Sequence, residues 1–431
     1  MSNIAAENPE GGKKSKKFGS FSTIYRSDAK VGRFLSVLAL SGISYGLYRG
    51  IQDNYLAELV HITAFERGIV EFFREIPGLL VVLILAWMYR FSESRIFKIG
   101  IICMAAGLAG LLISGTGKFI VVLFMVIFST GEHIIMPVKS TISLDLAKRD
   151  QGGASLGITN AISNIGNITG FIIVTSLFFV FSRLGFSRTD IIRFKAVYVA
   201  ALILMAGAVF TALALRESTI KVQRRRFYFA KKFVKFYMLE IFYGARKQIF
   251  ITFAPYVLIL QYGADTSIIS ILLAVCAFFG IILSPLMGRL IDKVGYRIIM
   301  VTDTLILIVV CILYGFAHRI FPPHIAYVVV CVNYVLDSII SIASMASNVY
   351  VQDIASSQEE ITATLSTGIS VNHVISILIA LMGGWIWKVT GIEVLFSLSA
   401  FLGLLNTLYA ATIKPGKPAA DTTVGSTPAG G

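Results

Sequence analysis

Apolar segments long enough to cross a bilayer recur along the whole chain, and short polar stretches separate them. A helix needs about 20 mostly apolar residues to span the hydrocarbon core. The pattern therefore predicts an all-α polytopic membrane protein with twelve transmembrane helices, each end placed to within ~2–4 residues. The predicted spans are Gly32–Tyr55, Arg67–Met88, Ile96–Gly115, Phe119–Leu144, Ala154–Phe181, Ile192–Leu215, Leu239–Gln261, Ile268–Leu290, Ile298–Ala317, Ile325–Val351, Thr362–Trp387 and Ile392–Ile413.

The composition agrees with a membrane protein and shows no secretory leader. The 431 residues are 56% hydrophobic and only 14% charged, with a mean hydropathy of +0.79. Soluble domains do not carry so many apolar runs. The first twenty residues contain lysines that lead into polar sequence rather than into a short apolar core with a cleavage site. We therefore expect the first span to stay in the mature protein.

The distribution of positive charge predicts the orientation in the membrane. The formal net charge of +14 raises the question of nucleic acid, but most of the 38 Lys and Arg fall on the connections predicted to share the side of the N-terminus. This asymmetry follows the positive-inside rule and places both termini in the cytoplasm. One outward connection departs from the rule, and we interpret it as a weak exception rather than a substrate-facing feature. Its basic residues are Arg183, Arg188, Arg193 and Lys195.

Neither the cysteines nor any motif indicates an enzyme, a cofactor or a metal. All the cysteines fall inside predicted spans without the Cys/His spacing typical of zinc, so we interpret them as packing residues. They are Cys103, Cys276, Cys311 and Cys331. The chain has no Walker loop, dinucleotide fingerprint or Gly-x-Ser-x-Gly elbow. Any transport would therefore draw its energy from an ion or solute gradient.

A charged, glycine-punctuated segment between two apolar runs is the most specific motif. Residues 288–297 read Gly-Arg-Leu-Ile-Asp-Lys-Val-Gly-Tyr-Arg. This segment closely resembles the signature loop of the major facilitator superfamily, Gly-x-x-x-Asp-Arg/Lys-x-Gly-Arg/Tyr-Arg. Its glycines would allow a tight reversal, its aspartate would cap a helix start, and its cations suit the cytoplasmic leaflet. The gating residues that the resemblance implies are Gly288, Asp292, Lys293, Gly295 and Arg297.

The resemblance implies a secondary transporter with two pseudo-symmetric six-helix bundles and a signature loop that stabilises one access state. The first-half copy of the loop, residues 86–95, has decayed and carries Arg90 where the aspartate should be. Weak repeats also suggest two halves, since Asp145-Leu146-Ala147 corresponds to Asp353-Ile354-Ala355. The expected domains are a basic cytoplasmic N-terminal tail (1–30), a first bundle (31–215), a basic amphipathic linker (216–238), a second bundle (239–413) and a disordered cytoplasmic C-terminal tail (414–431).

Acidic residues at membrane depth are candidates for proton coupling, because such groups are costly and line cavities or pair with each other. Glu132 and Asp337 lie near the middle of equivalent spans, so either is predicted to carry the coupling proton. The other candidates are Glu71, Glu75 and His373. Structural interpretations stay open. Glu132 would pair with Lys139, and the charged residues of span two would form a self-neutralising network.

Cations and amides at membrane depth predict a site for a small polar, anionic solute. Arg74 and Arg246 come from opposite halves, and a guanidinium can hold a carboxylate or phosphate bidentately. Asparagines in span five form a polar stripe that fits a cavity better than packing alone, while Gly166-x-x-x-Gly170 would allow a close helix contact. The predicted substrate-binding residues are Arg49, Arg74, Lys139, Asn160, Asn164, Arg246, Asn333 and Asn372.

The leading hypothesis is a monomeric transporter of a bacterial inner membrane, proton-coupled or exchange-driven, whose partners are the solute, protons and lipid but no nucleic acid. One alternative is a drug or amphiphile exporter of the same fold, for which the 31 Phe and 11 Met could line an apolar pocket. Span five lacks the Gly-Pro-x-x-Gly-Gly extension of drug/proton antiporters, which lowers that alternative. Another is a receptor or assembly factor of this fold that no longer moves solute.

We predict that single cysteines at positions 3 and 425 are both shielded from a membrane-impermeant maleimide in intact cells. An even number of spans returns the C-terminus to the side of the N-terminus, and the basic connections place that side in the cytoplasm. Both positions should react once the cells are permeabilised. Labelling of either position from outside intact cells would contradict the topology.

Overall fold

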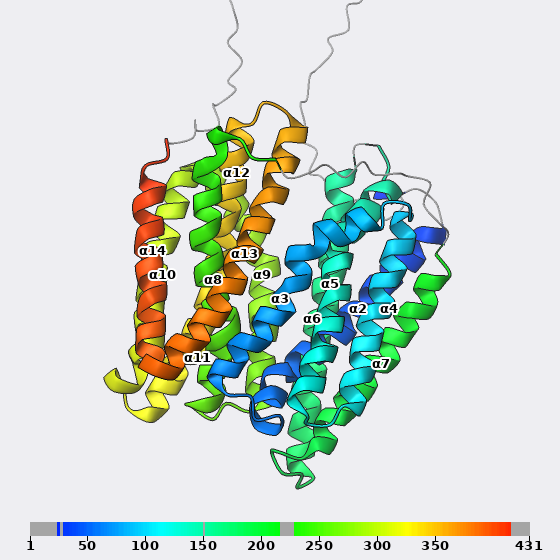
Figure 1. Cartoon of the computed structure of the whole chain (residues 1–431), viewed down its shortest axis with the longest axis vertical. Coiled ribbons are helices and arrows are strands. Elements are labelled where there is room, and N and C mark those ends of the chain that lie inside the picture. The colour runs from blue at the N-terminus through cyan, green and yellow to red at the C-terminus, as the bar shows by residue number, and fades with distance from the viewer. Residues whose placement is uncertain (1–23, 26–28, 150, 216–227, 415–431) are drawn as a thin grey trace, which may run out of the picture.

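The computed structural model describes residues 24–25, 29–149, 151–215 and 228–414, and these residues are helical apart from short connections. The predicted N-terminal tail, most of the linker and most of the C-terminal tail lie outside the described residues. Figure 1 shows the two halves of the chain as two groups of long helices side by side, α2 to α7 in one and α8 to α14 in the other.

The first half consists of long helices that run up and down through the bundle. Its elements are α2 (Ala29–Asn54), the π-helical turn η1 (Tyr55–Leu59), α3 (Ala64–Trp87), α4 (Glu93–Ile113), α5 (Lys118–Leu146), α6 (Gly152–Arg183) and α7 (Ile191–Leu213). The second half follows the same plan. Its elements are η2 (Lys231–Phe233), α8 (Val234–Leu260), α9 (Thr266–Val294), α10 (Tyr296–Ile320), α11 (Pro323–Ser341), η3 (Ile342–Ser344), α12 (Met345–Ile354), α13 (Gln358–Thr390) and α14 (Ile392–Ala411).

The helices agree with the predicted spans, and they show a multi-pass membrane protein. Among the described residues, ten helical segments are long and apolar enough to cross a membrane, with η1 joined to α2 and α12 joined to α11. The remaining two of the twelve predicted spans coincide with α3 and α8. Both helices carry several charged side chains, which lowers their hydropathy. Their crossing of the bilayer stays a prediction from the sequence.

The short connections follow from local capping chemistry. Thr63 begins α3 with a capping box, in which its hydroxyl accepts from the Glu66 amide and the Glu66 carboxylate accepts from the Thr63 amide. Asp190 and Asp265 cap α7 and α9 more simply, each with a side-chain oxygen that accepts from a backbone amide of the first turn. Gly295 joins α9 to α10 with φ of 87°, a backbone conformation that favours glycine.

The signature segment is more helical than the sequence suggested. Helix α9 continues to Val294, so Gly288 and Asp292 lie inside its last turns, and only Gly295 makes the reversal. The expectation that Asp292 caps a helix start is therefore wrong, because the next helix begins after Gly295. Asp292 is exposed and lies at the end of the bundle where α2 begins and α14 ends, which we call the terminal end.

The linker also ends earlier than expected, because α8 begins at Val234 rather than at residue 239. Its described part docks on α13 instead of facing lipid throughout. Tyr228 donates to the carboxylate of Glu360 at 2.7 Å, and Lys232 binds the same carboxylate at 2.7 Å. The hydrogen bond to Glu360 raises the pKa of the Tyr228 hydroxyl. Phe233 is fully buried in the second half.

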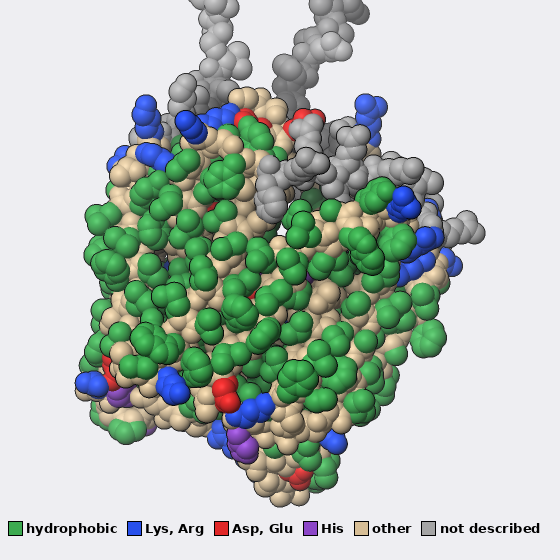
Figure 2. Space-filling model, in the orientation of Figure 1, with side chains coloured by type: hydrophobic (Ala, Val, Ile, Leu, Met, Phe, Trp, Pro, Cys, Tyr) green, Lys and Arg blue, Asp and Glu red, His purple; other side chains and the backbone are tan. Residues whose placement is uncertain are grey.

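Apolar side chains cover the flank of the bundle, as a lipid-facing surface requires. Figure 2 shows hydrophobic side chains over the whole middle of one face, with Lys and Arg near its two ends. Among the described residues, the exposed large hydrophobic side chains include Trp87 at 83% and Phe210 at 74% exposure. In water such a surface would cost free energy, whereas lipid tails are as apolar as the side chains themselves.

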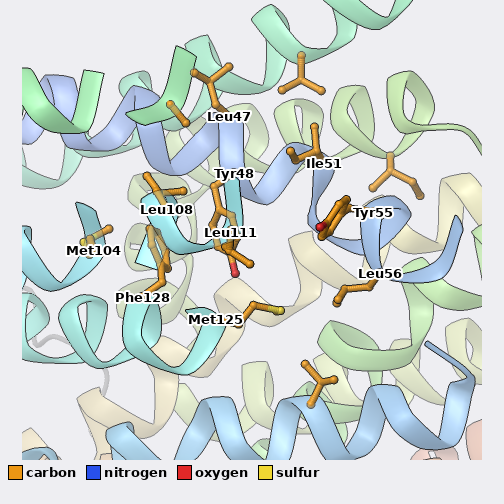
Figure 3. Close-up of a cluster of buried hydrophobic side chains, with 14 of the residues drawn as sticks. Leu47, Tyr48, Ile51, Tyr55, Leu56, Met104, Leu108, Leu111, Met125 and Phe128 are labelled. Atoms are coloured by element: carbon orange, nitrogen blue, oxygen red, sulfur yellow. The ribbon is translucent and has the colours of Figure 1, made fainter. Parts of the chain in front are cut away.

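The interior of the first half is a well-packed apolar core. Figure 3 shows Leu47, Tyr48, Ile51, Leu108 and Phe128 among the side chains that converge from α2, α4 and α5. The rings of Tyr48 and Phe128 are 4.3 Å apart at their centroids. This core fixes α2 against its neighbours and so positions the polar residues on the opposite face of the same helix.

Glycines bring α2 and α6 into backbone contact, as Gly166-x-x-x-Gly170 predicted. A Cβ on Gly170 would lie only 2.6 Å from the backbone nitrogen of Leu47, and one on Gly166 would lie 3.0 Å from Gly42. Small residues let membrane helices approach closely and gain van der Waals contact. The asparagine stripe of α6 ends at this contact, where the Asn167 amide, oriented with its nitrogen toward α2, donates to the carbonyl of Gly42.

We call the end of the bundle opposite the terminal end the far end. The two halves meet there. The Ser270 hydroxyl of α9 donates to the Phe171 carbonyl of α6 at 3.0 Å. Arg188 donates to Glu58 at 2.6 Å and to the carbonyls of Gly263 and Ala264 at 2.7 Å each. The hydrogen bonds to Glu58 raise the pKa of the Arg188 guanidinium. Arg188 belongs to the basic connection that was predicted to face outward as an exception to the positive-inside rule. In the structure it joins the two halves, and we call this set of contacts the clasp.

We predict that Gly170→Leu destabilises the protein, because no space exists between α6 and α2 for a side chain. Overpacking costs about 1–3 kcal/mol in ordinary cores, and contact with backbone should place this variant at the upper end. The melting temperature in detergent measures the effect. Gly157→Leu is the matched control on the same helix, since nothing lies within 4 Å of a Cβ at that position. Equal melting temperatures for the two variants would contradict the close contact.

Candidate functional site

A polar cavity of about 390 Å³ lies between the two halves. Its wall is formed by α2, α3 and α5 on one side and by α8, α9, α11 and α13 on the other. The lining residues are Tyr45, Arg49, Arg74, Glu75, Glu132, His133, Met136, Tyr243, Arg246, Lys247, Gln248, Phe250, Ile251, Leu273, Cys276, Tyr334, Asp337, Ser338, Ser341, Asn372, His373 and Ser376. Helices from both halves therefore share one chamber.

The structure brings most of the predicted site residues to this chamber. The predicted residues that line it are Arg49, Arg74, Arg246 and Asn372 among the binding candidates, and Glu75, Glu132, Asp337 and His373 among the coupling candidates. The other predicted residues lie outside the lining: Glu71, Lys139, Asn160, Asn164 and Asn333. Asn160 and Asn164 are exposed on α6, and the Asn333 amide donates to the Val329 carbonyl of its own helix at 2.8 Å.

A chain of buried charges runs along α3 from the far end to the cavity. Arg67, which is fully buried, binds Asp53 at 3.1 Å and Glu71 at 2.7 Å. Glu71 in turn accepts from Arg74 at 2.6 and 3.0 Å. The spacing of three and four residues places these side chains on one face of the helix. Because each charge has a partner, the helix can hold them without water.

Arg74 is the link between this chain of charges and the cavity. Its Nε and Nη2 atoms are held by Glu71, and Nη2 also lies 3.2 Å from Glu75. Its Nη1 lies 3.7 Å from Glu132 of α5. Most of the donors of Arg74 are therefore engaged with protein, and the competing interpretation of span two as a neutralised network describes Glu71 and Arg74 well.

Arg246 is held quite differently. Its side chain is 2% exposed, and its single described ion pair joins Nη1 to Asp337 of α11 at 3.4 Å. Its Nε and Nη2 atoms have no hydrogen-bond partner among the described residues. The guanidinium lies 5.2 Å from the ring centroid of Tyr243, which gives it a cation–π contact. It lies near the middle of α8.

A third group joins the two halves at the edge of the cavity. His373 of α13 contacts Glu75 of α3 through Nδ1 at 2.9 Å. His133 of α5 faces His373 with the ring centroids 5.3 Å apart. Sequence patterns alone did not pair these residues, because they come from three different helices.

Several lining residues had no signal in the sequence that would have identified them. Tyr45, Tyr243 and Tyr334 contribute hydroxyls and ring faces, but tyrosines are also common in membrane helices that only pack. Arg67 marks the predicted start of span two. Its spacing of four residues from Glu71 is the signal that could have placed it in the same network. Lys247 and Gln248 adjoin Arg246 and reach the cavity with it.

Comparisons with known proteins agree with the resemblance seen in the sequence. The model of the Major Facilitator Superfamily matches residues 236–430. A mutant of the nucleoside transporter NupG has a TM-score of 0.72 at 15% identity, over 90% of this chain and 100% of that chain. A POT family transporter in complex with 5-aminolevulinic acid has a TM-score of 0.68 at 13% identity, over 88% of this chain and 94% of that chain. No curated protein matches the chain by sequence.

We predict that Arg74→Lys lowers the melting temperature, because a lysine cannot hold both oxygens of Glu71 as the guanidinium does. Loss of one charged hydrogen bond costs about 1.5–3 kcal/mol. Arg90→Lys is the control, since Arg90 is exposed and donates only to Tyr89 among the described contacts. An unchanged melting temperature together with weakened solute binding would show instead that Arg74 acts mainly on the solute.

Proposed function

We propose that this chain, which has the fold of the major facilitator superfamily, is a secondary transporter for a small polar solute with an anionic group. The observation that carries the proposal is the guanidinium of Arg246. It is nearly fully buried, lines the cavity, and presents two nitrogen atoms without a partner in the described residues. Unsatisfied buried donors cost free energy, so a carboxylate or phosphate that accepts from them would be bound.

The rest of the cavity suits the same class of solute. Arg49, Arg74 and Lys247 add positive charge to the lining, and Tyr45, Tyr334 and three serines add hydroxyls. The volume of about 390 Å³ falls in the range of small-molecule sites, ~300–1,000 Å³. Solved structures of similar fold are named as nucleoside and peptide transporters. A strongly lipophilic solute would instead leave the charged lining without partners.

Alternating access follows from the way the halves meet. The clasp of Arg188 and the bond between Ser270 and Phe171 both lie at the far end. Near the terminal end, a Cβ on Gly288 of α9 would meet nothing within 4 Å. With the orientation predicted from charge, these far-end contacts would close the cavity to the outside. Rocking of one half against the other about the cavity would open the far end.

Asp337 is the residue that we assign to proton coupling. Asp337 lies on α11 and contacts Arg246 of α8. Its carboxylate and the anionic group of the solute would therefore compete for the same guanidinium. A proton on Asp337 would weaken its hold on Arg246 and free the guanidinium for the solute, which couples binding of the two. Glu132 lies beside Arg74 and Glu71 is fully engaged, so neither shares this competition.

The signature segment is proposed to act in the other access state. Asp292, Lys293 and Arg297 lie at the terminal end, on the last turn of α9 and the start of α10. In the superfamily that the segment resembles, the loop stabilises one state of the cycle. Closure of the terminal end would bring α9 toward the first half, so the contacts of Asp292 belong to that closed state.

We predict that Asp337→Asn abolishes accumulation driven by a pH gradient and spares exchange of solute across proteoliposome membranes. The amide cannot be protonated, so the solute still binds but no longer moves with a proton. Uptake of a labelled panel of metabolites, with and without the gradient, measures both activities. Asp190→Asn is the control, because it removes an acid that only caps α7. Gradient-driven accumulation by Asp337→Asn would place the coupling elsewhere.

We also predict that Arg246→Lys weakens binding of the anionic solute by about 10–100-fold, since charge is kept but the bidentate fork is lost. Binding to the purified protein is measured by its effect on the melting temperature. Arg90→Lys should bind as the original chain does. A screen in which lipophilic cations bind and anions do not would favour the exporter alternative.

A further inference from the structure

We propose that Glu75, His133 and His373 form a binding site for a divalent transition metal such as Zn²⁺, and that the bound metal joins the two halves. The three residues offer one carboxylate oxygen and two imidazole nitrogens, and the ligand atoms all lie within 4.8 Å of one another. Two imidazoles with one carboxylate are a set that holds Zn²⁺ and leaves a fourth position open. The proposal does not depend on the transport function.

The ligands are held in place by their neighbours, as metal ligands usually are. The Nδ1 atom of His133 lies 2.8 Å from the Ser129 carbonyl, which can only accept, so in the neutral imidazole Nδ1 is the nitrogen that donates to it. This tautomer leaves the Nε2 atom of His133 as the nitrogen available to a metal. The Arg74 guanidinium contacts one oxygen of Glu75, Oε1, and leaves Oε2 facing His373.

Gly78 gives the site its space. It lies on α3 one turn after Glu75, and a Cβ there would be 2.6 Å from Nε2 of His133 and 2.8 Å from Cε1 of His373. Any larger residue would enter the gap between the two imidazoles. Glycine at position 78 therefore leaves the space beside Nε2 of His133 free of a side chain from α3.

The origin of the ligands decides what a bound metal would do. Glu75 and His133 belong to the first half, whereas His373 belongs to the second half. A ligand that binds one conformation and not another stabilises the conformation it binds. Because this conformation brings the three residues together, the metal would hold the halves as they are in this structure. The fourth coordination position would face the cavity, where water or an anionic solute could occupy it.

The set differs from the other histidine–carboxylate pair among the described residues. His318 contacts Glu393 at 3.2 Å near the far end, but no second histidine adjoins them, and Arg319 shares the same carboxylate. His318 is therefore a matched control, a histidine beside a glutamate that lacks the third ligand.

The test is titration of the purified full-length protein in detergent with Zn²⁺ against a chromophoric chelator, without any solute. We expect one ion per chain, and His373→Ala and His133→Ala should each weaken the affinity by at least about tenfold. His318→Ala should leave it unchanged. Equal affinities for all these variants, or no binding beyond that of the detergent buffer, would overturn the site.

A measurement on the unaltered chain tests the site even if the variants fold poorly. X-ray absorption at the zinc edge should show two imidazole nitrogens and oxygen at about 2.0–2.2 Å. A sulfur shell would point to Cys276, and a shell of oxygen alone to adventitious binding, and either result would overturn the proposal. Zinc binding by a chain that moves no solute would support the metal site and contradict the transport function. Transport by a chain that binds no zinc would do the reverse.

Discussion

The cost of placing charge where water is scarce governs the arrangement of this molecule. A carboxylate or guanidinium in a membrane bundle needs a partner or an aqueous chamber, and the described residues use both solutions. On α3 the solution is pairing, from Asp53 and Arg67 through Glu71 to Arg74. At Arg246 the pairing is incomplete, and the guanidinium lies beside the cavity. The contrast separates charges that support the bundle from one that is available to a solute.

The sequence predicted much of the fold because hydropathy and glycine spacing are local properties. The long apolar runs became the helices, and Gly166-x-x-x-Gly170 became the close contact with α2. Helix ends were less predictable. Helix α9 continued through Gly288 because glycine only permits a turn, whereas the reversal at Gly295 required a positive φ. The amphipathic linker ended early because Phe233 packs into the second half.

The candidate site could be predicted only as a set of residues, without their partners. Depth along a span identified Asp337 and Arg246 separately, but their pairing depends on how α8 packs beside α11. A polar stripe on a helix looks the same in sequence whether or not it lines a cavity, and in this structure Asn160 and Asn164 are exposed outside the lining. The contact between Glu75 and His373 joins positions 298 residues apart, and nothing in either local sequence indicates the other.

The clasp at the far end has a consequence for how this protein tolerates sequence drift. Two of the acceptors of Arg188 are main-chain carbonyls, at Gly263 and Ala264, and a carbonyl is present whatever side chain the residue bears. A substitution in that connection therefore keeps both acceptors, provided that the left-handed turn at Gly263 is kept. Arg188 itself has no such freedom. The clasp thus depends on the side chains of only Arg188 and Glu58 and on the backbone conformation of Gly263.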